Sequence, residues 1–243
     1  MFKFIKNISI KSVSRVDLVE IYGIRHVLKT YNGTQKEIQI LKICNHPNII
    51  RYLDILHVDP ECTILVFPLE MISLTNLITN YMYDQWGVIK QIVEGLHYLH
   101  SNRILHLDLK SDNIMYTGGH VKIIDMGSSE IGEKVKVNVP KCTLTHRPPE
   151  GYYHGNSYVV DKYFDMWSLG IIIFEVLGGV PMYLAEIFPA YRIGMADAVY
   201  ERMVRSIEFR ERVKEELPEE LKRCLELEPM SRLDIRQIFE FLS

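Results

Sequence analysis

The chain has no apolar run long enough to cross a bilayer. A membrane-spanning helix needs about 20 apolar residues, but the most apolar stretch here, Leu169–Val180, is shorter than that and includes Glu175. The first residues, MFKFIKNISIK, alternate hydrophobic side chains with lysines, so they do not form the apolar region of a signal peptide. We therefore expect an intracellular protein, cytoplasmic or nuclear, with no membrane partner.

Cysteine and clustered basic charge are also scarce. The four cysteines are far apart and show no CxxC spacing, so we expect reduced, structural thiols rather than a zinc site or disulfides. Lysine and arginine are dispersed and the formal net charge is −3, which argues against nucleic-acid binding driven by overall charge. With 243 residues, 47% of them hydrophobic, the chain is long enough to form a substantial core.

The distribution of apolar residues changes along the chain. Residues 1–68 contain short segments in which β-branched and aromatic residues alternate with polar ones, which predicts an antiparallel sheet carrying one helix. From about residue 72 the spacing becomes helical. The fold class is therefore α+β, with a small β-rich lobe over about 1–68, a hinge over about 68–71 and a larger α-helical lobe over about 72–243. The strands are expected in FKFIKNISI, VDLVEI, IRHVLK, IIRYLDIL and CTILVFP, and the helices at 81–102, 161–177, 183–205, 217–225 and 233–242.

Two short loops, each following an apolar run, concentrate polar side chains. The first is HLDLKSDN with Asp108, Lys110 and Asn113, and the second is DMG with Asp125. Two carboxylates, an amide oxygen and a fixed cation are suited to binding magnesium and a polyphosphate. The alternative to a binding site is that these are ordinary charged residues of a solvated loop and that Asp125 is a turn residue at the end of a strand.

These two loops resemble the catalytic loop, HRDLKxxN, and the metal-binding loop, DFG, of eukaryotic-type protein kinases. The resemblance implies a bilobal kinase-like fold in which residues 1–243 form a single protein kinase domain. It implies that Asp108 orients the substrate hydroxyl, that Lys110 contacts the transferred phosphate, and that Asn113 and Asp125 hold Mg²⁺. ATP, Mg²⁺ and protein substrates are the expected cofactors and partners.

The resemblance extends to the nucleotide-binding residues before the hinge. Lys29 ends IRHVLK and resembles the lysine of the VAIK motif, and Glu37 matches its glutamate partner on the following helix. Glu37 also completes the sequence of a capping box that begins at Thr34, so an ion pair and a helix cap are both open. Val16 occupies the position that packs on adenine, or it is an ordinary strand valine.

Further along, TLTHRPPE resembles the family segment ending in APE. By that resemblance Thr143 bonds the catalytic residues and favours serine or threonine as acceptor. Glu150 is expected to pair with Arg232, and Asp165 to support the catalytic loop; we assign these three residues structural roles.

Three positions depart from the family pattern. The segment Ser9–Val16, which aligns with the glycine-rich phosphate loop, contains no glycine, and Met126 replaces phenylalanine. Leu107 replaces the arginine that binds a phosphorylated activation segment, so we expect segment 128–142 to be held without phosphorylation. The short first lobe also resembles kinases of large DNA viruses.

The function expected from these residues is transfer of the ATP γ-phosphate to serine or threonine of protein substrates. A pseudokinase, acting as a binding partner or decoy in kinase signalling, is the alternative, and the glycine-free loop favours it. A small-molecule kinase of related fold is a third interpretation. The physiological substrate, the upstream regulation and the oligomeric state are not indicated by the sequence.

Overall fold

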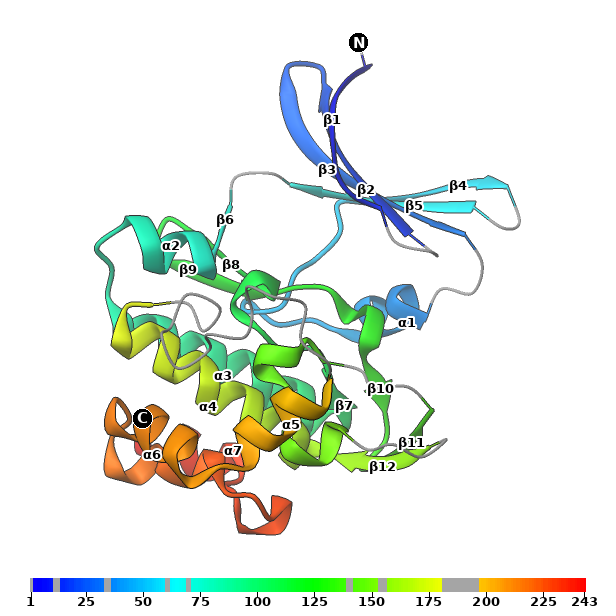
Figure 1. The fold of residues 1–243 in the computed structure, drawn as a ribbon. Coiled ribbons are helices and arrows are strands. Elements are labelled where there is room, and N and C mark those ends of the chain that lie inside the picture. The colour runs from blue at the N-terminus through cyan, green and yellow to red at the C-terminus, as the bar shows by residue number, and fades with distance from the viewer. Residues whose placement is uncertain are drawn as a thin grey trace. The chain divides into compact units, whose positions relative to one another are not determined.

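The computed structural model describes residues 2–10, 14–32, 36–59, 62–68, 71–138, 142–152, 157–180 and 197–243 (Figure 1). The chain forms two compact units. The first comprises Met1–Asn45 and Ile49–Met71, and the second comprises His46–Asn48 and Ile72–Ser243. Within the expected hinge, Leu69 and Glu70 lie outside the described residues.

The first unit is built on a five-stranded sheet in the order β1-β2-β3-β5-β4, with every neighbouring pair antiparallel. Alternation of apolar and polar residues puts Val19, Leu28 and Val66 together in a small buried cluster. The strands are β1 (Phe2–Ile10), β2 (Ser14–Ile21), β3 (Ile24–Asn32), β4 (Asp54–Asp59) and β5 (Cys62–Pro68).

Strand β1 lies at the edge of this sheet and contains two irregularities. Its register against β2 shifts between Phe4 and Lys6 and again between Asn7 and Ser9, so Ile5 and Ile8 are each left without an opposite residue. Both isoleucines are exposed, at 36% and 50%. The edge strand is therefore bulged twice within nine residues.

The single helix expected in this unit is α1 (Lys36–Ile43), whose Ile38, Ile40 and Leu41 are buried. The strand expected over IIRYLDIL begins only at Asp54, so that prediction was wrong at its start. Ile49 and Ile50 are buried in the segment before it, and their apolar character reflects this burial rather than a strand.

Two helices open the second unit, α2 (Leu74–Asn80) and α3 (Gln85–Ser101). The expected start of α3 at Tyr81 was four residues early. The Asp84 side chain accepts a hydrogen bond from the Gly87 amide and caps the helix, so Tyr81–Asp84 remain outside it.

Helix α4 (Lys162–Gly178) is the central helix of this unit and is buried on nearly all sides, as its sequence predicts. Asp161 caps its first turn by accepting a bond from the Tyr163 amide, and Gly179 ends it in the left-handed conformation at φ 66°. In Figure 1, α3 and α4 run side by side, consistent with the contacts between them.

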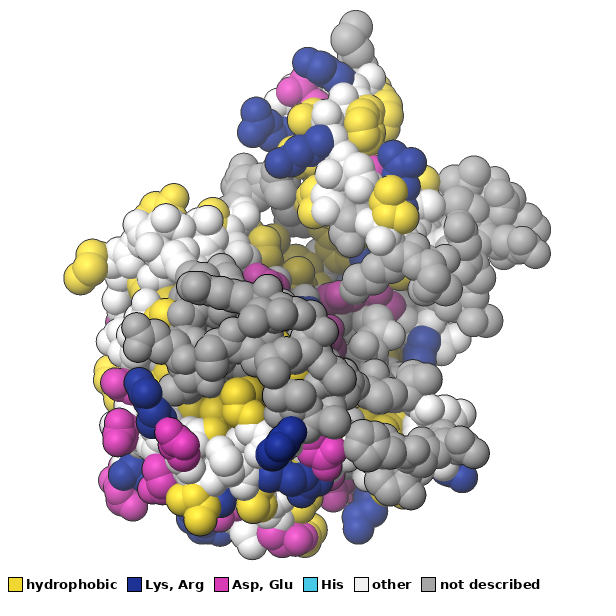
Figure 2. Space-filling view, in the orientation of Figure 1, with side chains coloured by type: hydrophobic (Ala, Val, Ile, Leu, Met, Phe, Trp, Pro, Cys, Tyr) yellow, Lys and Arg dark blue, Asp and Glu magenta, His cyan; other side chains and the backbone are white. Residues whose placement is uncertain are grey.

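The last part of the chain forms α5 (Asp197–Arg205), α6 (Ile207–Glu215) and α7 (Ile235–Phe241). Helix α6 was not predicted, and the stretch expected at 217–225 is a 3₁₀ helix over Glu219–Leu225. Of the helix expected at 183–205, residues 183–196 lie outside the described residues. On the face drawn in Figure 2, acidic and basic side chains are intermixed over this unit.

Three small sheets hold the loops that carry the motifs. The first sheet has the order β6-β8-β9, formed by β6 (Ile72–Ser73), β8 (Ile114–Thr117) and β9 (His120–Ile123). The second pairs β7 (Ile104–Leu105) with β10 (Glu130–Ile131), and the third pairs β11 (Lys134–Val137) with β12 (Tyr158–Asp161). Among the helices described, none is long and apolar enough to span a bilayer. A β-sheet unit followed by a helical unit confirms the α+β class.

Candidate active site

In the first unit, Lys29 and Glu37 form an ion pair. Lys29 lies on β3 and its Nζ donates to both carboxylate oxygens of Glu37, at 2.9 Å and 2.7 Å. The Glu37 side chain is 5% exposed and that of Lys29 12%, so the pair is largely shielded from water. Of the two interpretations of Glu37, the ion pair is present; Thr34, the start of the capping box, lies outside the described residues.

Val16 is directly opposite Lys29 in the β2–β3 register, and Leu65 is opposite Lys29 in β5. The sheet therefore brings a half-buried valine next to the lysine that was assigned to the nucleotide. Of the glycine-free segment, Ser9 pairs with Val16 and Ile10 with Arg15. Lys11–Val13, which would form the phosphate-covering turn, lie outside the described residues.

In the second unit, Asp108, Lys110, Asn113 and Thr143 are joined in one hydrogen-bonded network. Oδ1 of Asp108 accepts from the backbone amide of Thr143 at 2.9 Å and from its hydroxyl at 3.0 Å. Lys110 Nζ donates to the Thr143 hydroxyl at 2.6 Å and lies 3.5 Å from Oδ2 of Asp108. The Asn113 amide donates to the Asp108 carbonyl at 2.8 Å. Residues separated by more than thirty positions are thus brought together as the resemblance implied.

His106 connects the two motif loops. It is fully buried; its Nδ1 lies 3.3 Å from the Asp108 amide and its Nε2 3.0 Å from the Ile124 carbonyl. Since the amide must donate to Nδ1, Nε2 carries the proton and donates to Ile124. Ile124 also donates its amide to the Asn113 carbonyl at 2.9 Å. The residue before Asp125 is therefore tied to the catalytic loop by two hydrogen bonds.

Asn113 and Asp125 provide oxygen donors of the kind that Mg²⁺ binds. Both hydrogen bonds of the Asn113 side-chain amide use its nitrogen as donor, and no described residue donates to its Oδ1. Asp125 has φ 61°, a left-handed conformation that is uncommon for aspartate and is concentrated at functional sites. Mg²⁺ commonly takes one or two protein carboxylates and completes its shell with water and substrate phosphates, so this donor set fits it. Among the described residues, no group of three or more histidine, cysteine or acidic side chains is arranged to hold a metal ion.

Asp165 supports the catalytic loop from α4. Its two oxygens accept from the amides of His106 and Leu107, each at 2.8 Å, and Oδ2 also contacts His100 Nε2 at 2.9 Å. Burial alone would raise the pKa of this carboxyl, but the bonds from His100 and the His106 amide outweigh burial and lower it. Asp165 therefore remains a charged anchor inside the core.

Leu107 occupies the position of the family's arginine, and its side chain is buried. It has φ 62° and packs in an apolar cluster with residues from β7, β11, β12 and α4. Val137 and Cys142 of this cluster belong to segment 128–142. The cluster comprises Leu105, Leu107, Val137, Cys142, Val160 and Phe164, with Val135 and Tyr158 packed against it.

Glu150 and Arg232 form the expected architectural pair. The two guanidinium nitrogens Nη1 and Nη2 donate to the two carboxylate oxygens, each at 2.7 Å. The Arg232 side chain is fully buried, donates to the carbonyls of Tyr163, Glu226 and Leu227, and stacks over Trp167 at 5.3 Å.

One buried polar group of this region was missed by sequence reasoning. Glu175 accepts from the Ser111 hydroxyl and lies 3.3 Å from His146 Nε2. A single acidic residue within the apolar stretch Leu169–Val180 was the available indication, because a buried carboxylate requires partners.

Comparison with known proteins shows the class to which this site belongs. The protein kinase domain family matches residues 10–241, so the chain belongs to this family. Members use ATP with a divalent cation and act on protein substrates. The family is the one that the two loops indicated.

Individual relatives agree with this assignment. The chain is 35% identical over 159 residues to the serine/threonine-protein kinase CST20 of Candida albicans, a match that covers 62% of this chain and 12% of that protein. It is 33% identical over 216 residues to an Encephalitozoon cuniculi protein named "Probable cell division protein kinase", covering 85% and 79%. A crystal structure of the yeast RNA Pol II CTD kinase CTDK-1 complex matches in fold, with TM-score 0.76 at 20% identity over 98% of this chain and 91% of that one.

Proposed function

We propose that the protein is an active serine/threonine protein kinase that transfers the ATP γ-phosphate to protein substrates. The observation that carries the proposal is the network of Asp108, Lys110, Asn113 and Thr143. A chain that only bound partners would have no need of a carboxylate and a lysine held together at a phosphate-transfer loop.

The two oxygens of Asp108 are held differently, which suits a residue that receives a proton. Oδ1 is fixed by the two short bonds from Thr143, whereas the contacts of Oδ2 with the described residues are long, 3.4 Å to Asn113 Nδ2 and 3.5 Å to Lys110 Nζ. Oδ2 can therefore accept the hydrogen of a substrate hydroxyl. The nearby Lys110 ammonium would neutralise charge that develops on the transferred phosphate.

Asn113 and Asp125 would hold Mg²⁺, and Lys29 would contact the phosphates of ATP. The metal, when bound, neutralises phosphate charge and orients the leaving group. Glu37 keeps the Lys29 ammonium in a fixed position, so its charge needs little rearrangement when a phosphate arrives. The Thr143 contacts support serine or threonine as acceptor, in agreement with the name of the CST20 relative.

Replacing Lys29 with methionine tests this function directly. We expect phosphate transfer from radiolabelled ATP to a generic protein substrate to fall about a hundredfold, because one fixed positive charge at the phosphates is lost. Lys42→Met, an exposed lysine on α1, serves as the matched control and should retain activity.

The outcomes of that assay are distinct. Equal transfer by wild type and Lys29→Met would mean that the signal comes from elsewhere and would contradict the proposal. No transfer by folded wild-type protein, with magnesium or manganese and several substrates, would favour the pseudokinase alternative. Thermal unfolding of each variant shows whether it is folded.

A second prediction concerns regulation, since Leu107 packs with Val137 and Cys142 of segment 128–142 and β11 pairs with β12. Ser128→Ala and phosphatase-treated wild type should keep their activity within about twofold. Val137→Ala should lower the unfolding free energy by about 1 kcal/mol or more, and activity with it, because it leaves a cavity in the cluster. Loss of activity in Ser128→Ala, with recovery in Ser128→Glu, would contradict this prediction.

A further inference from the structure

A separate cavity of about 910 Å³ opens on the second unit, and none of the residues assigned to phosphate transfer lines it. It is lined by the end of α3, the start of β11, the start of α4 and part of α7. This volume is within the range of ligand-binding sites and much larger than a single ion requires. The cavity is therefore a candidate site for a ligand of side-chain or peptide size.

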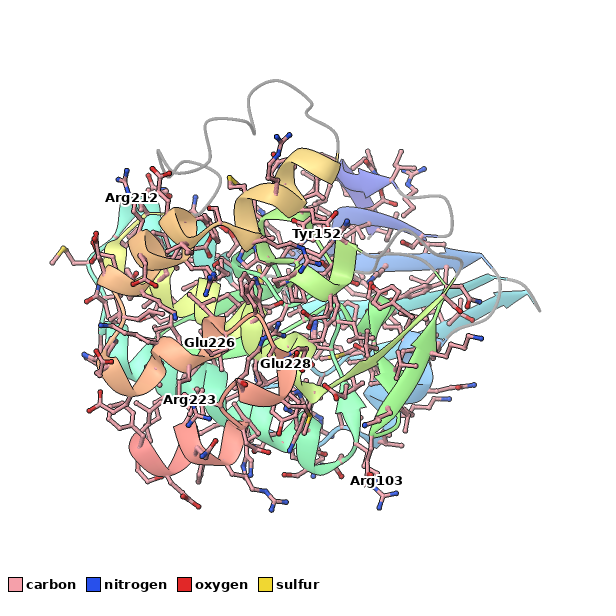
Figure 3. All side chains as sticks on the ribbon, turned by 60° about the horizontal axis from the view of Figure 1, so that its bottom comes forward. Arg103, Tyr152, Arg212, Arg223, Glu226 and Glu228 are labelled. Atoms are coloured by element: carbon pink, nitrogen blue, oxygen red, sulfur yellow. The ribbon has the colours of Figure 1, made fainter. Side chains whose placement is uncertain are left out.

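Basic side chains dominate the wall of this cavity. Arg103, Lys134, Lys162 and Arg236 line it, against the carboxylates of Glu133 and Asp161. On the face in Figure 2, by contrast, charges of the two signs are intermixed. Arg103, which is 71% exposed at its side chain, projects outward in Figure 3. An excess of cations in one concave site favours an anionic ligand.

Two of these cations already have carboxylate partners. Arg103 pairs with Glu133 at 3.4 Å, and Lys162 donates to Asp234. Within the described part of the chain, Lys134 and Arg236 form no ion pair. Asp161 is directly opposite Lys134 in the β11–β12 register, but one of its oxygens accepts from the Tyr163 amide as the cap of α4. Lys134 and Arg236 therefore leave an excess of positive charge over Asp161, which would attract the charge of about −1.5 to −2 on a phosphate monoester.

A buried polar atom gives an independent indication of a ligand. His100 lines the cavity, its side chain is 3% exposed, and its Nε2 contacts Asp165. Its Nδ1 is buried and has no hydrogen-bond partner among the residues described. Buried polar atoms are normally satisfied, so an unsatisfied one beside a cavity points to a group that the ligand supplies.

We propose that this cavity binds a phosphorylated serine or threonine on a polypeptide segment. The phosphate would lie between Lys134 and Arg236, and the side chains of Tyr163 and Met230 offer apolar surface for the residues flanking it. A peptide also carries backbone amides that can donate to Nδ1 of His100. Free phosphate would use the cations but would leave the apolar wall and His100 unsatisfied.

The cavity also lies close to Asp165, which supports the catalytic loop. His100 contacts Asp165, and Asp165 accepts from the amides of His106 and Leu107. The cavity and the catalytic loop therefore share one buried carboxylate. The binding proposal does not depend on phosphate transfer by this chain.

The test is fluorescence polarisation with a labelled peptide that carries one phosphoserine between two leucines. Wild type should bind this peptide and not its unphosphorylated form. The double variant Lys134→Ala/Arg236→Ala should raise Kd about tenfold or more, because charge-assisted bonds to the phosphate are lost. The control is Lys90→Ala/Arg212→Ala, which removes the same charges at exposed positions; Arg212 and Arg103 lie at opposite ends of the view in Figure 3.

Four results would overturn the proposal: no binding by folded wild type, binding that survives in the Lys134→Ala/Arg236→Ala variant, an equal loss in the control variant, or equal binding of the unphosphorylated peptide. Competition by inorganic phosphate as strong as by the unlabelled phosphopeptide would also overturn it, since the cavity would then recognise the anion without the peptide. Thermal unfolding of both double variants establishes that they are folded.

Discussion

Replacing Asp108 with asparagine is expected to lower kcat for phosphate transfer about a thousandfold. Asparagine keeps the size of the side chain, and its carbonyl oxygen can still accept from the Thr143 amide, which Oδ1 of Asp108 accepts at 2.9 Å. It cannot receive a proton from the substrate hydroxyl, so the loss should be in kcat, with KM for ATP changed little. Steady-state kinetics with radiolabelled ATP measures both constants.

Asp84→Asn is the matched control for that experiment. Asp84 caps α3 by accepting from the Gly87 amide at 3.0 Å, and asparagine caps helices equally well. The activity of the Asp84→Asn variant should stay within about twofold of wild type. If Asp108→Asn kept more than a tenth of the wild-type kcat, the role proposed for Asp108 would be wrong.

Arg232→Ala should lower the free energy of unfolding by about 3–5 kcal/mol. The change leaves the Glu150 carboxylate without its two 2.7 Å bonds and removes the donors to the carbonyls of Tyr163 and Glu226. It also removes the guanidinium packed over Trp167. Because natural proteins are stable by only about 5–15 kcal/mol, this single change should cost a large part of the total. Urea unfolding followed by tryptophan fluorescence measures it.

Arg212→Ala separates this effect from the general loss of an arginine. Arg212 is exposed on α6, and its replacement should change the unfolding free energy by less than about 0.5 kcal/mol. The double variant Glu150→Ala/Arg232→Ala should be more stable than the sum of the two single changes predicts, because neither partner is left as an unpaired charge. A loss below 1 kcal/mol in Arg232→Ala would contradict an architectural role for the pair.

The parts of the site that depend on local chemistry could be predicted from the sequence. The motifs with Asp108, Lys110, Asn113 and Asp125 supported the resemblance from which the roles of these residues were expected, and the same resemblance paired Lys29 with Glu37. The distant partners Thr143 and Arg232 came from motif resemblance, not from periodicity. The alternation of apolar residues was sufficient for the sheet except at the start of β4, and a stretch that is apolar nearly all round was sufficient for the buried helix α4.

The remaining features depend on tertiary contacts that no local pattern encodes. Helix α6 was missed because its charged sequence buries only Phe209 and Val213. Leu107 is buried and has a positive φ, and a sequence reveals neither feature. The link from His106 to Ile124 joins two loops that are eighteen positions apart, and it becomes visible only when both loops are folded.

The two bulges in β1 bear on how the protein behaves at high concentration. An edge strand with exposed Phe2, Phe4 and Ile10 offers an apolar row and unpaired backbone groups to another chain. Fibril-like stacking requires a continuous ladder over about six or seven residues. The register shifts at Ile5 and Ile8 divide the strand into shorter segments than that, and Lys3 and Lys6 add like charge along it. The irregular edge thus disfavours self-association of the protein through pairing of this edge strand with another chain.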